Sequence, residues 1–252
     1  MITKNERIGE ISYTLYGTPM KIIEYNTVDN ILIEFQDDYK FITKGTYRFF
    51  KKGIIKNPYD KSVYGVGIVG EEKVVINGTV CKEYNLWHNM ITRCYNQKLK
   101  EKHNTYVECN CCKDWLYYPN FKKWYNENKW DSSLSFELDK HILIKNNKIY
   151  SPDTCLLVDH RINCLILNNK KIRGKFPQGM SKNKNRYKVM IDKKNVPTYL
   201  GEYKTVEEAF SVYKKEKEKY IKEVAEYYKN TYAKFPKKIY KAMINYKIEI
   251  SD

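Results

Sequence analysis

Five polar side chains between Asp139 and Asn163 have the types and spacing of a site that could hydrolyse a phosphodiester bond. They are Asp139, His141, Asp159, His160 and Asn163. Such hydrolysis needs a deprotonated water, a cation near the phosphate charge and stabilisation of the departing oxygen. A neutral His can take the proton, while an Asp carboxylate and an Asn carbonyl oxygen can hold a hard divalent ion such as Mg²⁺. The same residues also suit a well-capped hairpin and helix that carry no chemistry.

The elements around these residues are predicted to position them. Asp139 and His141 are two residues apart in "FELDKHI", where strand alternation places both side chains on one face. Ser151 is predicted to N-cap a helix whose first residue is Pro152, a position that suits proline. The sequence therefore predicts a strand, a polar turn and then a helix.

The predicted helix carries the other candidate residues. Asp159 and Asn163 are four residues apart, so they share one helical face. Asp159 is therefore a candidate to assist an ion held by Asn163. His160 lies elsewhere on the helix, three residues before Asn163, where it is a candidate phosphate contact.

The charge of the chain points to a polyanionic partner. Among 252 residues, 46 Lys and Arg stand against 30 Asp and Glu, which gives a net charge of +16. Residues 170–252 hold 22 basic and 10 acidic side chains, whereas residues 1–60 hold 9 and 8. Because such an excess attracts polyanions, we expect nucleic acid as the partner, bound chiefly by the last third of the chain.

Membrane and zinc-ribbon proteins fit the sequence less well. No apolar run approaches the roughly 20 residues of a spanning helix, and "MITKNERIGE" lacks the apolar core of a secretory signal. We therefore expect a cytoplasmic protein without a membrane partner. The seven cysteines lack the paired spacing of a zinc ribbon, and reduced thiols are the expected state. A zinc site of Cys109, Cys112 and His103 stays open as an alternative.

Composition and patterning predict an α+β chain in three parts. The runs "MKIIEY" and "NILIEF" predict a small β-barrel-like unit or a curled sheet, and the Pro and Gly residues of "NPYDKSVYGVGIVG" predict a linker. The predicted organisation is an N-terminal β-rich domain (1–57), a linker (58–70), a central domain (71–169) and a basic C-terminal domain that ends in a short helix (170–252).

Several local patterns predict individual elements. Asn77 and Gly78 supply the positive φ angles of a tight hairpin turn between two β-rich runs. Thr205 and Glu208 have the spacing of a capping box at a helix start, and Pro236 suits the first turn of a last helix. The buried stripe of the helix after Thr205 is predicted to be Phe210, Tyr213, Tyr220, Val224 and Tyr227.

Residues 178–213, "QGMSKNKNRYKVMI…PTYLGEYKTVEEAFSVY", resemble the Apetala/ethylene-response-factor type of DNA-binding domain. The shared features are Gly179-x-Ser181, the Arg186-Tyr187 strand entry, "YLGEYKT" and the "EEA" helix start. The resemblance implies a three-stranded antiparallel sheet backed by one helix, with the sheet in the DNA major groove. By position, the implied DNA-facing residues are Lys182, Lys184, Arg186, Lys188, Lys193 and Tyr199.

The runs "WHNMITRCYNQ", "YVECNCCKDWLYYPNFKKWY" and "LDKHILIKNNKIYSPDTCLLVDHRIN" together resemble phage HNH endonucleases of the homing type. The resemblance covers residues 84–168 and implies a ββα-metal unit. It implies that Asp139 and Asn163 hold one divalent ion, Mg²⁺ or Mn²⁺, and that His141 is the general base. In that family the Asp and the His are adjacent, whereas Lys140 separates them here.

These patterns lead to two main hypotheses. The first is a phage-encoded homing-type HNH endonuclease in the bacterial host cytoplasm, which nicks or cuts double-stranded DNA held by the C-terminal sheet. The second is a catalytically inactive DNA-binding protein of the same architecture, acting as a regulator or as an inhibitor of a host system. RNA binding through the 24 tyrosines is a third, which core packing explains better. The N-terminal domain is expected to add DNA contacts or to bind a protein partner.

Overall fold

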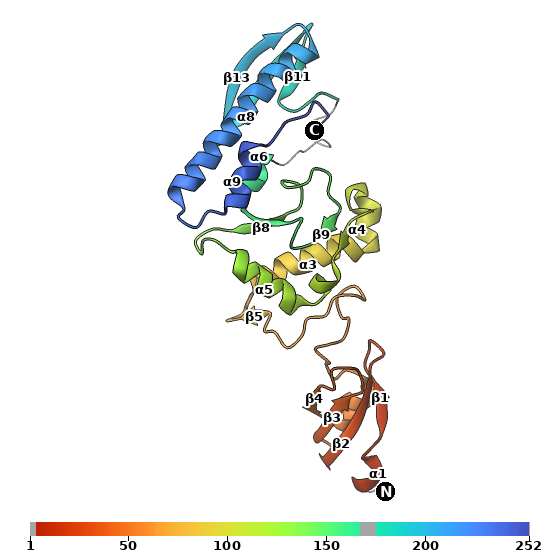
Figure 1. Cartoon of the computed structure of the whole chain (residues 1–252). Coiled ribbons are helices and arrows are strands. Elements are labelled where there is room, and N and C mark those ends of the chain that lie inside the picture. The colour runs from red at the N-terminus through yellow and green to blue at the C-terminus, as the bar shows by residue number, and fades with distance from the viewer. Residues whose placement is uncertain (1–3, 167–174, 252) are drawn as a thin grey trace. The chain divides into compact units, whose positions relative to one another are not determined.

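The computed structural model describes residues 4–166 and 175–251, which form a mixed α+β fold (Figure 1). The chain divides into two compact units, Met1–Tyr125 with Lys148–Ser151 and Asn126–Asn147 with Pro152–Asp252. We call them unit 1 and unit 2. The expected α+β class is confirmed at this level, while the domain limits expected at residues 57, 70 and 169 stay predictions.

An open antiparallel sheet of four strands begins unit 1. Its strands are β1 (Ile11–Tyr13), β2 (Pro19–Thr27), β3 (Asn30–Phe35) and β4 (Ile42–Gly45), paired in chain order. In the part of the chain that the structure describes, no sheet closes into a barrel, so the expectation of a closed barrel is wrong and an open sheet stands in its place. The short helix α2 (Tyr47–Lys52) supplies Phe50 to the buried core of this sheet, which removes the need for closure. The core is Met20, Ile22, Tyr25, Ile31, Ile33, Phe35, Phe50 and Ile55.

Residues 58–70, the predicted linker, pack within unit 1. Asp60 and Val63 are buried, and Asp60 accepts a hydrogen bond from Thr18 Oγ1 at 2.5 Å. The backbone N–H of Gly70 donates to Pro58 O at 2.9 Å. This segment is therefore folded chain with buried side chains.

The rest of unit 1 is built around a tryptophan core. The Trp87 Nε1–H donates to Trp115 O at 2.7 Å, and both rings are buried. The hairpin turn at Asn77 and Gly78 is confirmed, with φ angles of 49° and 76°. Apart from α1 (Lys4–Arg7), the remaining elements here are β5 (Val75–Ile76), β6 (Thr79–Val80), α3 (Lys82–Tyr95), α4 (Gln97–Lys102), η1 (Asn104–Tyr106), β7 (Asn110–Cys111), η2 (Lys113–Leu116), α5 (Tyr118–Asn128) and β9 (Ile149–Tyr150).

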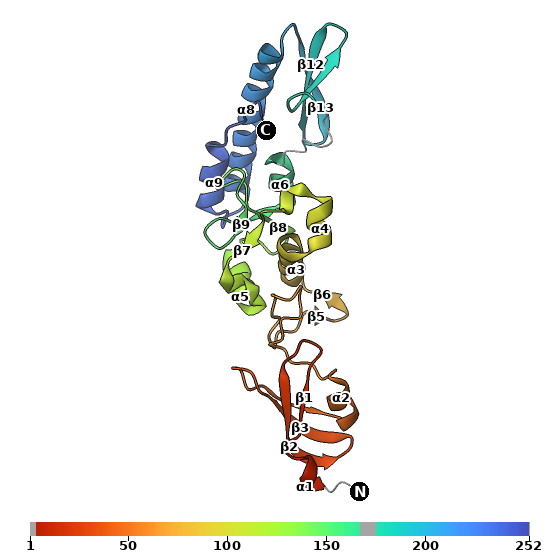
Figure 2. The same cartoon turned by 90° about the vertical axis from the view of Figure 1, so that its right-hand side faces the viewer.

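Unit 2 combines a strand pair and helix with a three-stranded sheet and two helices. The antiparallel strands β8 (Phe136–Asp139) and β10 (Leu156–Asp159) lead directly into α6 (His160–Ile166). In Figure 2, α8 runs beside the second sheet. The elements of that second part are β11 (Met180–Asn183), β12 (Arg186–Lys193), β13 (Val196–Tyr203), α8 (Val206–Thr231) and α9 (Lys237–Ile244).

The helix expected from Pro152 begins instead at His160. The residues after Ser151 form a turn, and the apolar run Leu156–Asp159 is a strand paired with β8. Leu157 and Val158 are both buried, which a strand that is covered on both faces allows for consecutive apolar residues. Asp159 therefore lies at a strand end and does not share a helical face with Asn163.

The predicted start of α8 is confirmed. The Thr205 hydroxyl accepts from the Glu208 N–H at 3.2 Å, and the Glu208 carboxylate accepts from the Thr205 N–H at 3.3 Å. The predicted buried stripe is right except at Tyr227, which is exposed, whereas its neighbour Tyr228 is 2% exposed. Over a long helix of 3.6 residues per turn, the buried face drifts away from a fixed spacing.

Gly179 lies where the chain entering the second sheet touches α8. Its φ is +76°, and a Cβ there would lie 2.1 Å from the ring of Tyr213. We expect Gly179→Ala to lower the free energy of unfolding by about 2–5 kcal/mol, since the left-handed backbone costs about 1–2 kcal/mol and overpacking about 1–3 kcal/mol. Urea denaturation followed by circular dichroism measures this loss.

Gly78→Ala is the matched control for that change. Gly78 has the same φ of +76°, but no atom lies within 4 Å of its added Cβ. It should therefore lose only the backbone part, about 1–2 kcal/mol. Equal losses in the two variants would show that the contact with Tyr213 is not tight.

Candidate nucleic-acid interface and cleavage site

Glu137, His160 and Asn163 meet at one end of the β8–β10 pair. Glu137 lies in β8, and α6 begins directly after Asp159 at that end of the pair. The first turn of α6 carries two polar side chains back to Glu137, whose Oε1 is paired with His160 Nδ1 and whose Oε2 accepts from Asn163 Nδ2. We call these three residues the Glu137 cluster.

The Glu137 cluster is open to solvent. The His160 side chain is 67% exposed and that of Glu137 is 34% exposed. The hydrogen bond to the Glu137 carboxylate, together with its negative charge, raises the pKa of His160 above its usual value. His160 Nε2 faces the Cys164 thiol at 3.4 Å, a weak hydrogen-bonding partner. A substrate oxygen can therefore approach this edge of the ring.

Asp139, the predicted metal ligand, is turned into the loop after β8. It is 7% exposed, and its Oδ1 accepts from the N–H groups of His141 at 2.8 Å and Ile142 at 2.7 Å. Asp139 stands opposite Leu156, whereas α6 follows the other end of β10. The structure therefore does not bring Asp139 together with Asn163, and Asp139 caps a loop instead.

Burial gives Asp139 a testable pH signature. It raises the pKa of this carboxyl above its usual value, although the two backbone donors pull the pKa down. A raised pKa in the folded protein stabilises the fold below the unfolded pKa, and this stability is lost as pH rises through the folded pKa. We therefore expect the free energy of unfolding of the wild type to fall relative to that of Asp139→Asn as pH rises above about 4.

Urea denaturation of both proteins at several pH values measures this difference. Asp131→Asn is the control, because hydrogen bonds from Ser133 lower the pKa of the exposed Asp131. The wild-type carboxylate of Asp131 adds stability above its unfolded pKa. The free energy of unfolding of the wild type should therefore rise relative to that of Asp131→Asn as pH rises. A difference at Asp139 that does not depend on pH would contradict the expectation.

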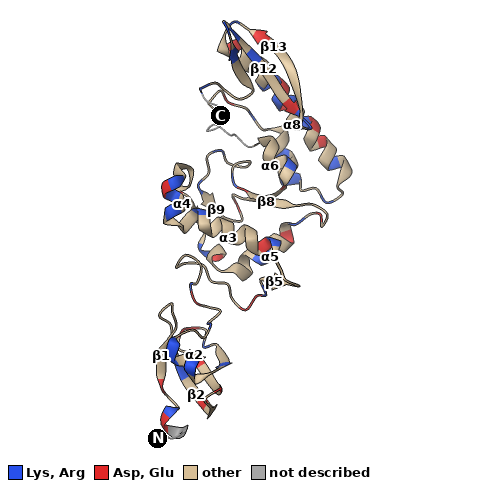
Figure 3. Cartoon of the chain, turned by 180° about the vertical axis from the view of Figure 1, so that it is seen from behind, with Lys and Arg blue, Asp and Glu red and all other residues tan. Residues whose placement is uncertain are grey.

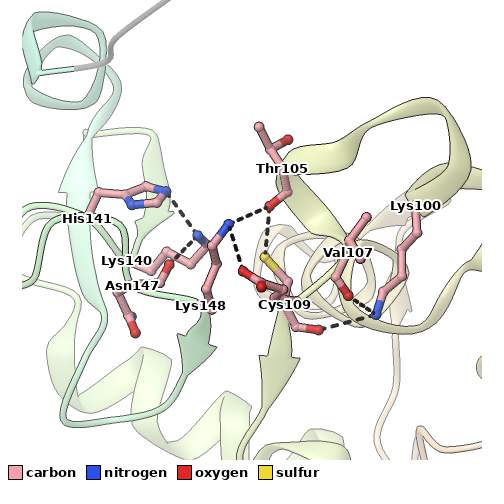
Figure 4. Close-up of polar contacts among 9 residues, drawn as sticks. Lys100, Thr105, Val107, Cys109, Lys140, His141, Asn147 and Lys148 are labelled. Carbon is pink, nitrogen blue, oxygen red and sulfur yellow. Dashed lines mark hydrogen bonds and ion pairs between the residues drawn. The ribbon is translucent and has the colours of Figure 1, made fainter. Parts of the chain in front are cut away.

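His141, the predicted general base, lies in the loop and not on the strand. β8 ends at Asp139, so the alternation expected to place both side chains on one face does not continue. Lys140 Nζ lies 2.9 Å from His141 Nε2 and donates to Asn147 O at 2.7 Å (Figure 4). Since Lys140 is 6% exposed, this amine helps to build the loop.

Asp159, the predicted auxiliary ligand, accepts a hydrogen bond from the hydroxyl of Tyr228 in α8. Burial, followed by this bond to Asp159, raises the pKa of Tyr228. Asp159 pairs with Phe136 across the strands, so alternation puts its side chain on the face opposite that of Glu137. Asp159 therefore joins β10 to α8 and lies apart from the Glu137 cluster.

The donor chemistry of the Glu137 cluster fits a divalent ion. Carboxylate and amide oxygens suit Mg²⁺ and Mn²⁺, and imidazole suits transition metals. Within residues 4–166 and 175–251, no three His, Cys, Asp or Glu side chains are grouped for metal binding, so an ion here would need the amide oxygen of Asn163 beside the carboxylate of Glu137. Among the same described residues, Cys109, Cys112 and His103 do not form such a group either.

Glu137 is the functional candidate that the sequence reasoning missed. It lies two residues before Asp139 in a strand whose Phe136 and Leu138 are buried and apolar. An acidic residue that alternates with buried apolar ones marks the other face of a strand. That signal was available in the sequence. Only the strand register shows that Glu137, and not Asp139, lies beside α6.

The sheet β11–β13 has one face covered by α8 and one that is open. Val189 and Ile191 of β12 are 0% and 2% exposed and face α8. The residues that alternate with them along the strand, Arg186, Lys188 and Met190, therefore point away from α8. Cross-strand partners share a face, which adds two residues each from β11 and β13. The open face consists of Ser181, Asn183, Arg186, Lys188, Met190, Tyr199 and Glu202.

The open face carries two cations, an aromatic ring and one carboxylate, that of Glu202. Lys188 Nζ lies 5.8 Å from the ring centroid of Tyr199, which is 56% exposed. Asn183 Nδ2 donates to Glu202 Oε1 at 2.7 Å. Cationic side chains contact phosphates, while amide and guanidinium groups can also reach base edges.

The predicted DNA-facing residues divide between the two faces and a turn. Lys182 pairs with Tyr187 and so lies on the α8 side, and Lys193 Nζ bonds to Glu216 Oε1 of α8 at 2.5 Å. Lys184 lies in the exposed turn between β11 and β12, with a φ of 50°. The residues that the structure brings together on the open face are Arg186, Lys188 and Tyr199.

The exposed side of α8 is not a second basic surface. Figure 3 shows Lys and Glu alternating along this helix. Lys214 Nζ lies 3.6 Å from Glu218 Oε1, and Lys219 Nζ lies 3.9 Å from Glu223 Oε1. These pairs at i, i+4 spacing neutralise one another, as expected for a solvated helix face.

Both candidate groups, the Glu137 cluster and the open face, belong to unit 2. In the described ranges, no helix has the length and apolar character that crossing a membrane requires. No protein-family model, curated protein or solved structure matches this chain.

Proposed function

We propose that this chain is a DNA endonuclease of the HNH type, which uses Mg²⁺ or Mn²⁺ and holds double-stranded DNA on the open face. The observation that carries the proposal is the Glu137 cluster, in which a carboxylate, an imidazole and an amide meet on a strand–strand–helix unit and remain accessible. The net charge of +16 supports a polyanionic substrate.

Each residue of the cluster has a role in this proposal. Glu137 and Asn163 would hold the ion through carboxylate and amide oxygens. When bound, such an ion lowers the pKa of a water and neutralises charge on the phosphate. His160 is oriented by its Nδ1 contact with Glu137, so Nε2 is the atom that meets the substrate. The bond to Glu137 raises the pKa of His160, which favours the protonated ring, so His160 would donate the proton to the departing oxygen.

The open face would position the DNA. A major groove about 12 Å wide admits a two-stranded β-ribbon. Arg186 can fork onto guanine or phosphate, whereas Lys188 acts as a point charge on phosphate. Because phosphate contacts carry no sequence information, affinity is expected to exceed sequence selectivity.

A nicking assay on supercoiled plasmid tests the proposal. The wild type should convert the plasmid to open circles in Mg²⁺ or Mn²⁺ but not in EDTA, and His160→Ala and Asn163→Ala should not. His141→Ala is the matched control, since His141 lies in the loop after β8 and should keep its activity. A wild type that binds the plasmid but never nicks it would overturn the proposal.

DNA binding without cleavage is the second candidate function. The HNH resemblance implies that Asp139 is the metal ligand and His141 the general base. In the structure both side chains instead contact groups of the loop after β8, which favours this second candidate. A regulator or inhibitor of this architecture should retard DNA in a gel with or without Mg²⁺. It should leave supercoiled plasmid intact under both conditions.

A further inference from the structure

We infer that α8 is a rigid spacer that fixes the distance along DNA between the open face and the Glu137 cluster. The inference rests on the proposed binding of DNA by the open face. Both groups lie in unit 2, and α8 contacts the sheet of the open face and, through Tyr228, Asp159 at the end of β10, the residue directly before α6. Figure 2 shows α8 extending along β12 and β13.

The N-terminal half of α8 is fixed to the sheet at successive turns. Tyr213 packs against Gly179 at the entry to β11 so closely that no Cβ fits between them. Farther along the helix, Glu216 pairs with Lys193 at 2.5 Å. One turn later, the Tyr220 hydroxyl accepts from the Lys194 N–H at 3.0 Å. The end of the sheet at the β12–β13 turn therefore faces the C-terminal half of the helix.

The C-terminal half of α8 is fixed to the strands that carry the cluster. Tyr228 donates to Asp159, the residue directly before His160. Trp130 packs between β8 and α8, a contact that we call the joint. Its ring centroid lies 5.2 Å from that of Phe136 in β8 and 6.1 Å from that of Tyr228. These aromatic rings are buried, so the joint is a packed core.

The length of α8 between these two attachments sets the distance between the sheet and the β8–β10 pair. Fifteen residues separate Tyr213 from Tyr228, which is about 22 Å at 1.5 Å per residue. On B-DNA with about 3.4 Å per base pair, that length corresponds to about 6–7 base pairs. DNA seated on the open face would therefore meet the cluster within about 6–7 base pairs of the contact centre, on the side of the β12–β13 turn.

Affinity cleavage with the full chain tests this spacing without depending on catalysis. The protein selects duplexes from a random-sequence pool in EDTA, and footprinting locates the centre of the contact. An iron chelate attached to the exposed Cys164, next to Asn163, then generates radicals that cut nearby DNA. A Cys164→Ser chain is treated identically. Its cuts come from chelate attached to Cys81 and Cys112 and are subtracted from those of the wild type.

We expect one narrow band of chelate cuts, on one side of the footprint centre and within about 6–7 base pairs of it. Trp130→Ala removes the joint and should spread the band while the footprint stays. Trp124, whose ring centroid lies 4.6 Å from that of Trp115 in unit 1, is the control: Trp124→Ala should leave the band narrow. Cuts on both sides, cuts spread along the duplex, or a footprint without cuts would each overturn the spacer.

The Mg²⁺ reaction on the same duplexes separates this inference from the proposed function. A narrow chelate band without Mg²⁺-dependent nicks supports the spacer and removes the nuclease. Nicks that scatter around the footprint support the nuclease and overturn the spacer. A chain that leaves no footprint on any selected duplex overturns DNA binding by the open face and the spacer with it.

Discussion

Glu137→Gln is expected to lower the rate of plasmid nicking in Mg²⁺ by about 100-fold or more. The change keeps the size of the side chain but removes the charge that would hold the ion and that raises the pKa of His160. Both the ion and the proton donor would be affected, so the loss should exceed that of a single hydrogen bond. Initial rates of open-circle formation, measured at equal DNA occupancy, give the ratio.

Asp139→Asn is the matched control, because it is the same chemical change two residues along the chain. Asp139 accepts from backbone N–H groups, and an Asn carbonyl oxygen can do the same, so nicking should stay near the wild-type rate. NMR titration adds a readout that is independent of activity: the pKa of His160 should fall towards about 6.5 in Glu137→Gln. An unchanged pKa together with an unchanged rate would remove Glu137 from the site.

The second large effect is expected from the pair of cations on the open face. Arg186→Ala combined with Lys188→Ala should weaken DNA binding at least about tenfold, at roughly 1 kcal/mol or more for each contact. The slope of log affinity against log salt should become shallower by about 2, because each phosphate contact releases about 0.9 counterions. Gel shifts or anisotropy across a salt series measure both quantities.

Lys182→Ala combined with Lys193→Ala removes two positive charges from the same sheet. These residues lie on the α8 side, and Lys193 is already paired with Glu216, so the slope should change by much less than 2. The two double variants have the same net charge, which cancels any effect of charge alone. Equal slopes in both would show that the open face is not the binding surface.

The features that sequence predicted well depend on neighbouring residues. The capping box at Thr205 and Glu208 needs only the first turn of a helix, and the turn at Asn77 and Gly78 needs only positive φ angles. The runs of β2 and β3 were predicted from strand patterning over a few residues. Each of these predictions is decided within one short stretch of chain.

The features that sequence missed depend on pairing between distant segments. Leu156–Asp159 becomes a strand because β8 is there to pair with it, although Ser151 and Pro152 suit a helix start. Glu137 gains its neighbours only once α6 follows β10. Lys182 falls on the α8 side because of its register with Tyr187, and a shift by one residue would reverse this.

Residues 148–151 belong to unit 1, although the residues on both sides of them belong to unit 2. β9 in this stretch pairs with β7, and its Tyr150 is 1% exposed. A fragment that ends at residue 125 would lose this buried ring, and one that begins at residue 126 would carry it without its partner strand. A single recombination crossover that keeps unit 1 whole must therefore retain the chain through residue 151, and one that keeps unit 2 whole must retain it from residue 126, so each transfer carries part of the other unit.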